Sequence, residues 1–419
     1  MRKRSGLFIN NIQILAVLCF LITFFDLTYI NYIFKYTKII RAIISLVILI
    51  LCSGRIKRLI KLKPKTLYLL LIVSLYIIVN SLIKGRSITL LFGNLIPCFL
   101  LCITIYITAN QKEIIEILKI WCCLFFVLLI IDLYTMVRFP KGLYSTETYT
   151  TNWFLGYETY RLSFTFPLIV FYYYLCLFSK GKMGILYVIT LLVAVDAYLS
   201  GGTAAFLIVI IYMVLVFLTM QKQYHKKDNF WGKILNIALN YRVFLIFYTF
   251  LILTIVINQN SFKLYDFLLA YFGKSATNGG RTRIWAGTMQ ILQDNWFFGA
   301  GMLTGAEYKS YIIRYNNAHN VILTYLVTGG IIGLIILLLY FVELFRFIEK
   351  NQQYLFIELF FYCFFILGIA SSALAFSPYV FAISILPLMD YKKPYKIKMK
   401  NQRYTITIRN KNYESSVRN

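Results

Sequence analysis

A histidine and an asparagine, His319-Asn320, are followed after nine residues by Gly330 and then by Gly333. His319 is the residue of this motif that can do acid–base chemistry, because a neutral imidazole accepts a proton from a hydroxyl near neutral pH. Asn317 and Asn320 flank it with amides suited to hydrogen bonding with hydroxyls. The two glycines predict that another helix approaches closely. A histidine that only caps a helix is the alternative.

A second group in the same hydrophilic loop, Gly280-Arg281-x3-Trp285, has the features of an anion site. Arg281 follows two glycines at an expected helix start, where free backbone N–H groups and a forked guanidinium both favour phosphate. Trp285 lies four residues on, on the same helical face, where its ring packs on a ligand or serves as an ordinary interfacial Trp. Arg283 points off that face and is the weaker candidate.

The composition indicates a membrane protein. The chain has 419 residues, 60% hydrophobic and 14% charged, with a mean hydropathy of +0.72, whereas soluble domains are roughly 25% charged. A formal charge of +27 is typical of basic cytoplasmic loops and does not indicate nucleic-acid binding. The eight cysteines fall in or beside apolar runs, so we expect packing residues and neither disulfides nor metal ligands.

The apolar runs predict an all-α, polytopic integral membrane protein of about twelve transmembrane helices. These are expected at 7–25, 39–54, 66–83, 88–109, 119–137, 162–178, 184–200, 202–220, 243–258, 319–341, 354–371 and 373–389. With the N-terminus inside, the inner loops carry about twice as many Lys and Arg as the outer ones, so both termini are expected in the cytoplasm. We therefore divide the chain into helices one to nine (1–258), an extracytoplasmic catalytic loop (259–318), helices ten to twelve (319–390) and a basic cytoplasmic tail (391–419).

Two outer segments are too long to be simple turns. Residues 138–161 are rich in Tyr, Thr and Trp, and residues 259–318 contain amphipathic helical patterns at 263–272 and 283–292, separated by a glycine break at 277–280. The second segment is net positive on the side where positive charge is usually depleted, which indicates an anionic ligand. The alternative is that its arginines extend to lipid headgroups.

Several common catalytic motifs are absent. The sequence has no Asp-x-Asp or Glu-x-Asp pair, which disfavours a metal-dependent glycosyltransferase, and no Gly-x4-Gly-Lys-Ser/Thr loop for ATP. It has no Gly-x-Ser-x-Gly elbow of the kind found in serine hydrolases.

The two motifs resemble the O-antigen polymerase and ligase superfamily of bacterial envelope polysaccharide enzymes. The specific part covers about residues 278–333 and includes Trp296-Phe-Phe-Gly299-Ala-Gly301; Arg161, before Pro167, resembles an earlier family arginine. The resemblance implies glycosyl transfer from an undecaprenyl-pyrophosphate-linked glycan at the outer face of the membrane. It implies that Arg281 with Arg161 binds the pyrophosphate, that His319 activates the acceptor hydroxyl, and that neither nucleotide nor metal cofactor is needed. The lipid bilayer and a chain-length regulator and flippase of the same pathway are its candidate partners.

Two alternatives to a polymerase stay open. One is a ligase that moves finished glycan to an acceptor; we prefer a polymerase because the loops show no domain for a macromolecular acceptor. The other is a lipid-linked oligosaccharide flippase, which places charges along a path within the spans. The acidic residues inside spans, Asp132, Asp196 and Glu358, either line such a path or are structural, and we favour the structural role.

Overall fold

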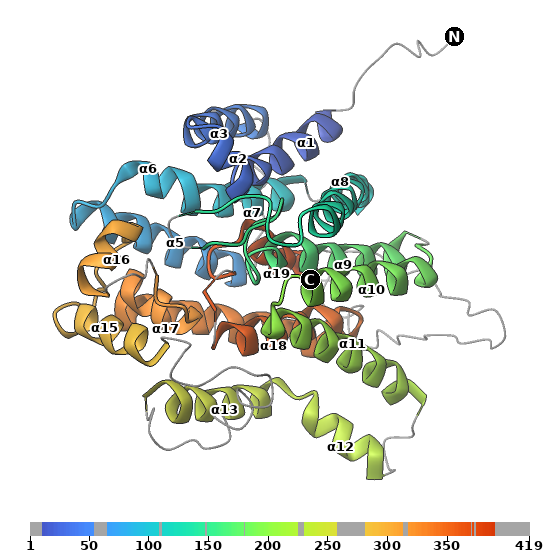
Figure 1. The fold of residues 1–419 in the computed structure, drawn as a ribbon. Coiled ribbons are helices and arrows are strands. Elements are labelled where there is room, and N and C mark those ends of the chain that lie inside the picture. Colours follow the sequence, from blue (N-terminus) through green and yellow to red (C-terminus); the bar gives the residue numbers. More distant parts are fainter. Residues whose placement is uncertain are drawn as a thin grey trace.

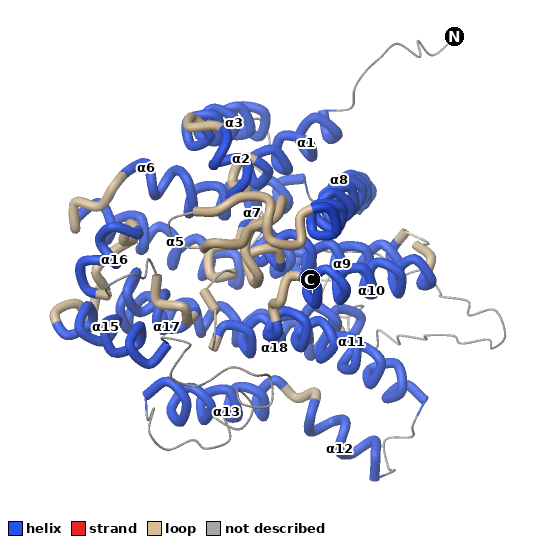
Figure 2. The backbone as a smooth tube through the Cα atoms, viewed as in Figure 1, coloured by secondary structure: helices blue, strands red, loops and turns tan. Residues whose placement is uncertain are grey.

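The computed structural model describes residues 11–53, 65–108, 111–146, 149–179, 181–224, 230–257, 281–312, 317–369, 371–372 and 374–389. Every regular element in these ranges is a helix, and the β pairing there consists of two isolated bridges (Figure 2). The all-α class is therefore confirmed for this part of the chain. The amphipathic pattern at 263–272, the glycine break at 277–280 and the tail at 391–419 lie outside the described residues.

The twelve predicted apolar segments each coincide with helical structure. The first eight correspond to α1 (Asn11–Phe24), α3 (Thr37–Ser53), α5 (Lys65–Ile83), the continuous run of α6 (Ile88–Leu90), η1 (Leu91–Leu95) and α7 (Ile96–Thr108), α8 (Gln111–Arg138), α9 (Leu162–Phe178), α10 (Met183–Leu199) and α11 (Thr203–Tyr224). The last four correspond to α13 (Tyr241–Leu251) with η2 (Ile252–Ile257), α17 (Val321–Lys350), η3 (Gln352–Tyr354) with α18 (Leu355–Gly368), and α19 (Pro378–Ile385) with η4 (Leu386–Leu388). Short helices that were not predicted are α2 (Thr28–Ile33), α12 (Phe230–Ala238) and α16 (Gly305–Tyr311).

Three helices in the described ranges are long and apolar enough to cross a membrane by length and composition, namely Lys65–Ile83, Lys112–Arg138 and Val321–Lys350. Shorter apolar helices of 10–17 residues occupy other predicted segments. These helices indicate a membrane protein. The count of twelve crossings and the orientation of the loops stay predictions.

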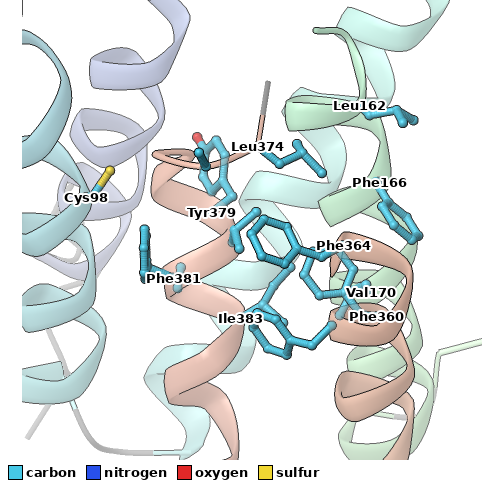
Figure 3. Close-up of a cluster of buried hydrophobic side chains, with 14 of the residues drawn as sticks. Cys98, Leu162, Phe166, Val170, Phe360, Phe364, Leu374, Tyr379, Phe381 and Ile383 are labelled. Atoms are coloured by element: carbon cyan, nitrogen blue, oxygen red, sulfur yellow. The ribbon is translucent and has the colours of Figure 1, made fainter. Parts of the chain in front are cut away.

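The core is built around α9, which is apolar on all sides and is buried along nearly its whole length. A helix of that kind must be surrounded by other helices, and α9 packs against α8, α10, α18 and α19. Figure 3 shows side chains of α9, α18 and α19 gathered in one cluster. The rings of Phe166 in α9 and Phe360 in α18 have centroids 4.8 Å apart. The eight cysteines all lie in the described ranges and form no disulfide there, and all except Cys123 are buried, as expected for packing residues.

The helices of the segment that precedes α17 lie beside α17 or beside each other. α15 (Arg281–Gln293) packs on α17 and α16, and α17 packs along α5 (Figure 1). A capping box begins α16, in which Thr304 Oγ1 accepts from the Glu307 N–H and the Glu307 carboxylate accepts from the Thr304 N–H. Arg86, after α5, donates to Glu307 Oε1 at 2.6 Å and to the Ala300 carbonyl at 2.8 Å. The loop between α15 and α17 is thereby tied to the end of α5.

Candidate active site

Asn320 forms the N-cap of α17. Its Oδ1 accepts from the Leu323 N–H at 2.9 Å, and its Nδ2 donates to the Ile369 carbonyl at 3.0 Å. The side chain is 0% exposed. Both ends of the amide bind the protein's own backbone, so in place of the predicted contact with substrate hydroxyls we assign Asn320 to holding the start of the helix.

His319 immediately precedes this cap in an unusual backbone conformation. Its φ is +47°, the one positive φ among the non-glycine residues that the structure describes. Its N–H donates to Asn317 Oδ1 at 2.8 Å, and Ser372 Oγ donates to the same oxygen at 3.0 Å. The Asn317 amide oxygen therefore holds the strained turn through the His319 N–H and links it to Ser372. Strain of this kind persists where surrounding contacts impose it, and it concentrates at functional sites.

The surroundings of His319 keep its imidazole neutral. Burial, together with the positive charge of Arg281, lowers its pKa to about 4. At neutral pH the ring is therefore a proton acceptor and not a cation. Because the charge of Arg281 contributes to this shift, the two residues lie within electrostatic range of each other.

α15 presents its three predicted residues very differently. Arg281 is the first residue of the helix and is partly exposed, while Arg283 is exposed. Trp285 is 1% exposed and belongs to the hydrophobic core. A ring without accessible surface positions α15 on its neighbours, so we assign Trp285 to packing in place of the predicted contact with substrate. Arg281 is left as the charged group at the helix start.

Tyr157 is a neighbour of Arg281 that was not singled out beforehand. Burial and the adjacent Glu158 raise the pKa of the Tyr157 hydroxyl, and the charge of Arg281 opposes that rise. Its ring stacks on Tyr149 with centroids 3.9 Å apart and planes 14° apart. Two residues on, Thr159 Oγ1 is 3.2 Å from Ser371 Oγ. The signal available in the sequence was the Tyr- and Thr-rich composition of residues 138–161, without a pattern to select one residue.

Arg161 lies in a buried ion-pair network. It is 0% exposed, and its Nη1 lies 2.8 Å from Asp132 Oδ2 and 3.5 Å from Asp196 Oδ1. Its Nη2 and Nε donate to the carbonyls of Gly156 and Glu158 at 3.0 and 3.1 Å. The guanidinium donors are thus occupied by protein acceptors, as a buried charge requires. We therefore assign Arg161 to holding the 156–161 segment in place of direct pyrophosphate contact.

The carboxylates inside the helical bundle are paired, as the structural interpretation of them expected. Asp132 Oδ1 also accepts from the Leu155 N–H at 2.7 Å, so Asp132 and Arg161 together tie the segment before α9 to α8. Glu358 in α18 is 2% exposed and accepts a hydrogen bond from the Tyr362 hydroxyl. No group of three or more His, Cys, Asp or Glu side chains in the described ranges is arranged to hold a metal ion.

The two glycines of the histidine motif have different roles. Gly333 faces the Tyr76 ring of α5, where an added Cβ would lie 3.2 Å from the ring, so the expected close helix approach is confirmed there. Gly330 faces a turn and not a helix. Its φ of 62° and ψ of −166° break α17, and an added Cβ would lie closer than 3.0 Å to the Phe297 carbonyl. The expectation of a helix neighbour was wrong at Gly330, where the glycine is needed for its backbone conformation.

One known family matches the part of the chain that contains His319 and Arg281. Residues 185–338 match the family model described as O-antigen ligase. The matched segment contains Arg281, His319, Gly330 and Gly333, whereas Arg161 precedes it. A comparison with curated proteins gives no match. The matched domain confirms the resemblance of this chain to the O-antigen polymerase and ligase superfamily.

Proposed function

We propose that this protein joins undecaprenyl-pyrophosphate-linked oligosaccharide repeats into capsular, O-antigen or exopolysaccharide chains at the outer face of the cytoplasmic membrane. The observation that carries the proposal is a neutral, part-buried His319 within electrostatic range of Arg281, both inside the segment matched by the O-antigen ligase model. A cation beside a proton acceptor suits a reaction in which a lipid pyrophosphate leaves and a sugar hydroxyl attacks.

Arg281 serves the donor side of the proposed reaction. Its guanidinium grips phosphate oxygens through paired N–H donors, and the first backbone N–H groups of α15 add to the positive potential at this helix end. Negative charge grows on the pyrophosphate as its bond to the anomeric carbon breaks. A fixed cation at that position stabilises the transition state more than the ground state.

His319 serves the acceptor side. The acceptor hydroxyl oxygen forms a bond to the anomeric carbon, the bond from that carbon to the pyrophosphate oxygen breaks, and the hydroxyl proton passes to the imidazole. One displacement inverts the anomeric configuration. The donor's own pyrophosphate linkage supplies the free energy, so the step needs no nucleotide, and the chemistry is proposed as metal-independent.

Donor binding also prepares the base. With the site empty, the positive charge of Arg281 weakens the basicity of His319. A bound pyrophosphate offsets that charge, so the pKa of His319 rises toward its ordinary value when the donor is present. The base is then strongest when a donor is available to react.

The experiment is extension of lipid-linked repeats by purified protein in liposomes, with chain length read on a gel. His319→Ala is expected to abolish long chains, while His225→Ala, a change of the chain's other histidine, keeps them. Arg281→Lys retains the charge but loses the fork, and it is expected to be strongly impaired; Arg346→Lys, a change at an exposed arginine of α17, is the control. Normal chains from His319→Ala would overturn the assignment of the base.

A ligase is the second candidate, because the matched family model is described by that activity. The two are distinguished in cells by what accumulates when the gene is deleted. Loss of a polymerase leaves single repeats, whereas loss of a ligase leaves long lipid-linked polymer. A flippase, the candidate from another class, moves lipid-linked repeats across liposomes without lengthening them.

A further inference from the structure

The break in α17 is filled by a turn from the outer loop. The Ile331 N–H donates to the Trp296 carbonyl at 2.9 Å, and the Ala300 N–H donates to the Val327 carbonyl at 2.7 Å. These bonds replace pairings that a continuous helix would make within itself. In a lipid environment, irregular backbone survives only where such groups are satisfied by the protein. The 295–301 turn is therefore built into the helical bundle and is not a free extracytoplasmic loop.

α5 supports the same turn from its other side. Asn80 Nδ2 donates to the Phe298 carbonyl at 2.7 Å and to the Thr328 carbonyl at 3.2 Å, so one buried amide joins the turn to α17. The Tyr76 hydroxyl donates to the Phe298 carbonyl at 3.2 Å. The turn is consequently held at the level of residues 76–80 of α5.

Charged side chains show how deep that level lies. Lys65 begins α5 and pairs with Glu343 of α17 at 3.1 Å, and Lys84, just past the other end, donates to Asn295 Oδ1 at 3.2 Å. At about 1.5 Å per residue, the 19 residues of α5 span about 28 Å, close to the ~30 Å hydrocarbon core. Asn80 lies four residues before Lys84, hence about 6 Å inside that boundary.

The turn carries three apolar side chains that are exposed on the surface of the protein. Trp296, Phe297 and Phe298 are 46%, 66% and 59% exposed. We propose that the 295–301 turn is a re-entrant aromatic anchor whose three rings contact the acyl chains of the leaflet predicted to be outer. Aromatic side chains inserted about 5–10 Å below the headgroups are a stable interfacial arrangement. Because α15 ends at Gln293, the anchor ties the helix that carries Arg281 to the membrane surface.

Fluorescence of Trp296 tests this in the full-length protein in liposomes. Wild-type protein and Trp296→Phe are compared in phosphatidylcholines brominated either near the headgroup or near the chain end. We expect the headgroup-proximal bromines to quench a component of the emission that Trp296→Phe lacks, and the chain-end bromines to quench it less. Trp285→Phe is the matched control, because a ring that is 1% exposed contributes no lipid-accessible component.

Two results would overturn the anchor. One is a Trp296 component quenched by aqueous iodide and by neither brominated lipid, which places the turn in water. The other is strongest quenching by chain-end bromines, which places it deep in the bilayer. The measurement requires no glycosyl transfer, so its outcome is independent of the proposed enzymatic activity.

Discussion

Replacing Gly330 by Ala should destabilise the protein at one defined point. The residue adopts φ 62° and ψ −166°, a region nearly exclusive to glycine, where another residue costs about 1–3 kcal/mol. The new Cβ would also lie closer than 3.0 Å to the Phe297 carbonyl and to the Gly299 nitrogen. Relieving that contact moves the turn away from α17 and breaks the two shorter of its three backbone hydrogen bonds to that helix, at roughly 1 kcal/mol each. The expected loss in the free energy of unfolding is therefore about 3–5 kcal/mol.

Two neighbouring glycines provide matched controls on the same helix. At Gly329 an added Cβ meets the Tyr76 ring at 3.5 Å, an ordinary contact, and at Gly333 it meets the same ring at 3.2 Å. Gly329→Ala should be neutral or slightly stabilising, because alanine favours helix over glycine by about 1 kcal/mol. Gly333→Ala requires only a small ring movement and should cost about 1 kcal/mol or less.

The assay is thermal unfolding of the three variants in one detergent, followed by the fraction of monodisperse protein after heating. Gly330→Ala should melt several degrees below wild type, and Gly329→Ala should melt with it or above it. If Gly330→Ala and Gly329→Ala melted together, the break in α17 would not depend on the glycine, and the account of the motif spacing would be refuted.

Three further predictions follow from the site. Arg281→Gln should raise the pH at which the residual kcat/KM falls on acidification. His319 accepts a proton only when neutral, and its pKa of about 4 rises when the positive charge of Arg281 is removed. An unchanged acid limb of the pH profile would contradict the electrostatic coupling of Arg281 and His319. Arg161→Ala should abolish accumulation of folded protein, because it leaves Asp132 and Asp196 buried without a compensating cation. The expected loss in the free energy of unfolding is about 3–5 kcal/mol. A well-folded but inactive variant would instead favour direct contact of Arg161 with pyrophosphate. Arg86→Ala should lower the melting temperature slightly, because the partly exposed pair with Glu307 contributes roughly 1 kcal/mol or less. The part that comes from Glu307 should be lost in acid. Hydrogen bonds from Thr304 and Arg86 lower the pKa of Glu307, so this contribution is present above the ordinary carboxyl pKa and is lost as the pH falls through the lowered one. The part that comes from the bond of Arg86 to the Ala300 carbonyl should stay.

Helix positions were largely predictable because the apolar runs are long and their ends carry turn-forming or charged residues. α9 occupies the predicted 162–178 range, and α15 covers the predicted amphipathic pattern at 283–292. The break in α17 was not predictable. Glycines stand at 329, 330 and 333, and which of them takes a positive φ depends on a turn that precedes them by about thirty residues in the chain.

The same division holds for the charged residues. The sequence by itself determined that His319 and Arg281 stand at helix starts beside a hydrophilic loop, because spacing and helix-start signals are local. Arg161 has an equivalent local setting at the start of α9, yet only the tertiary structure decided that it is buried. Its partners, Asp132 and Asp196, come from α8 and α10. A buried cation needs anions around it, and residues that distant in the chain meet only when the helices pack.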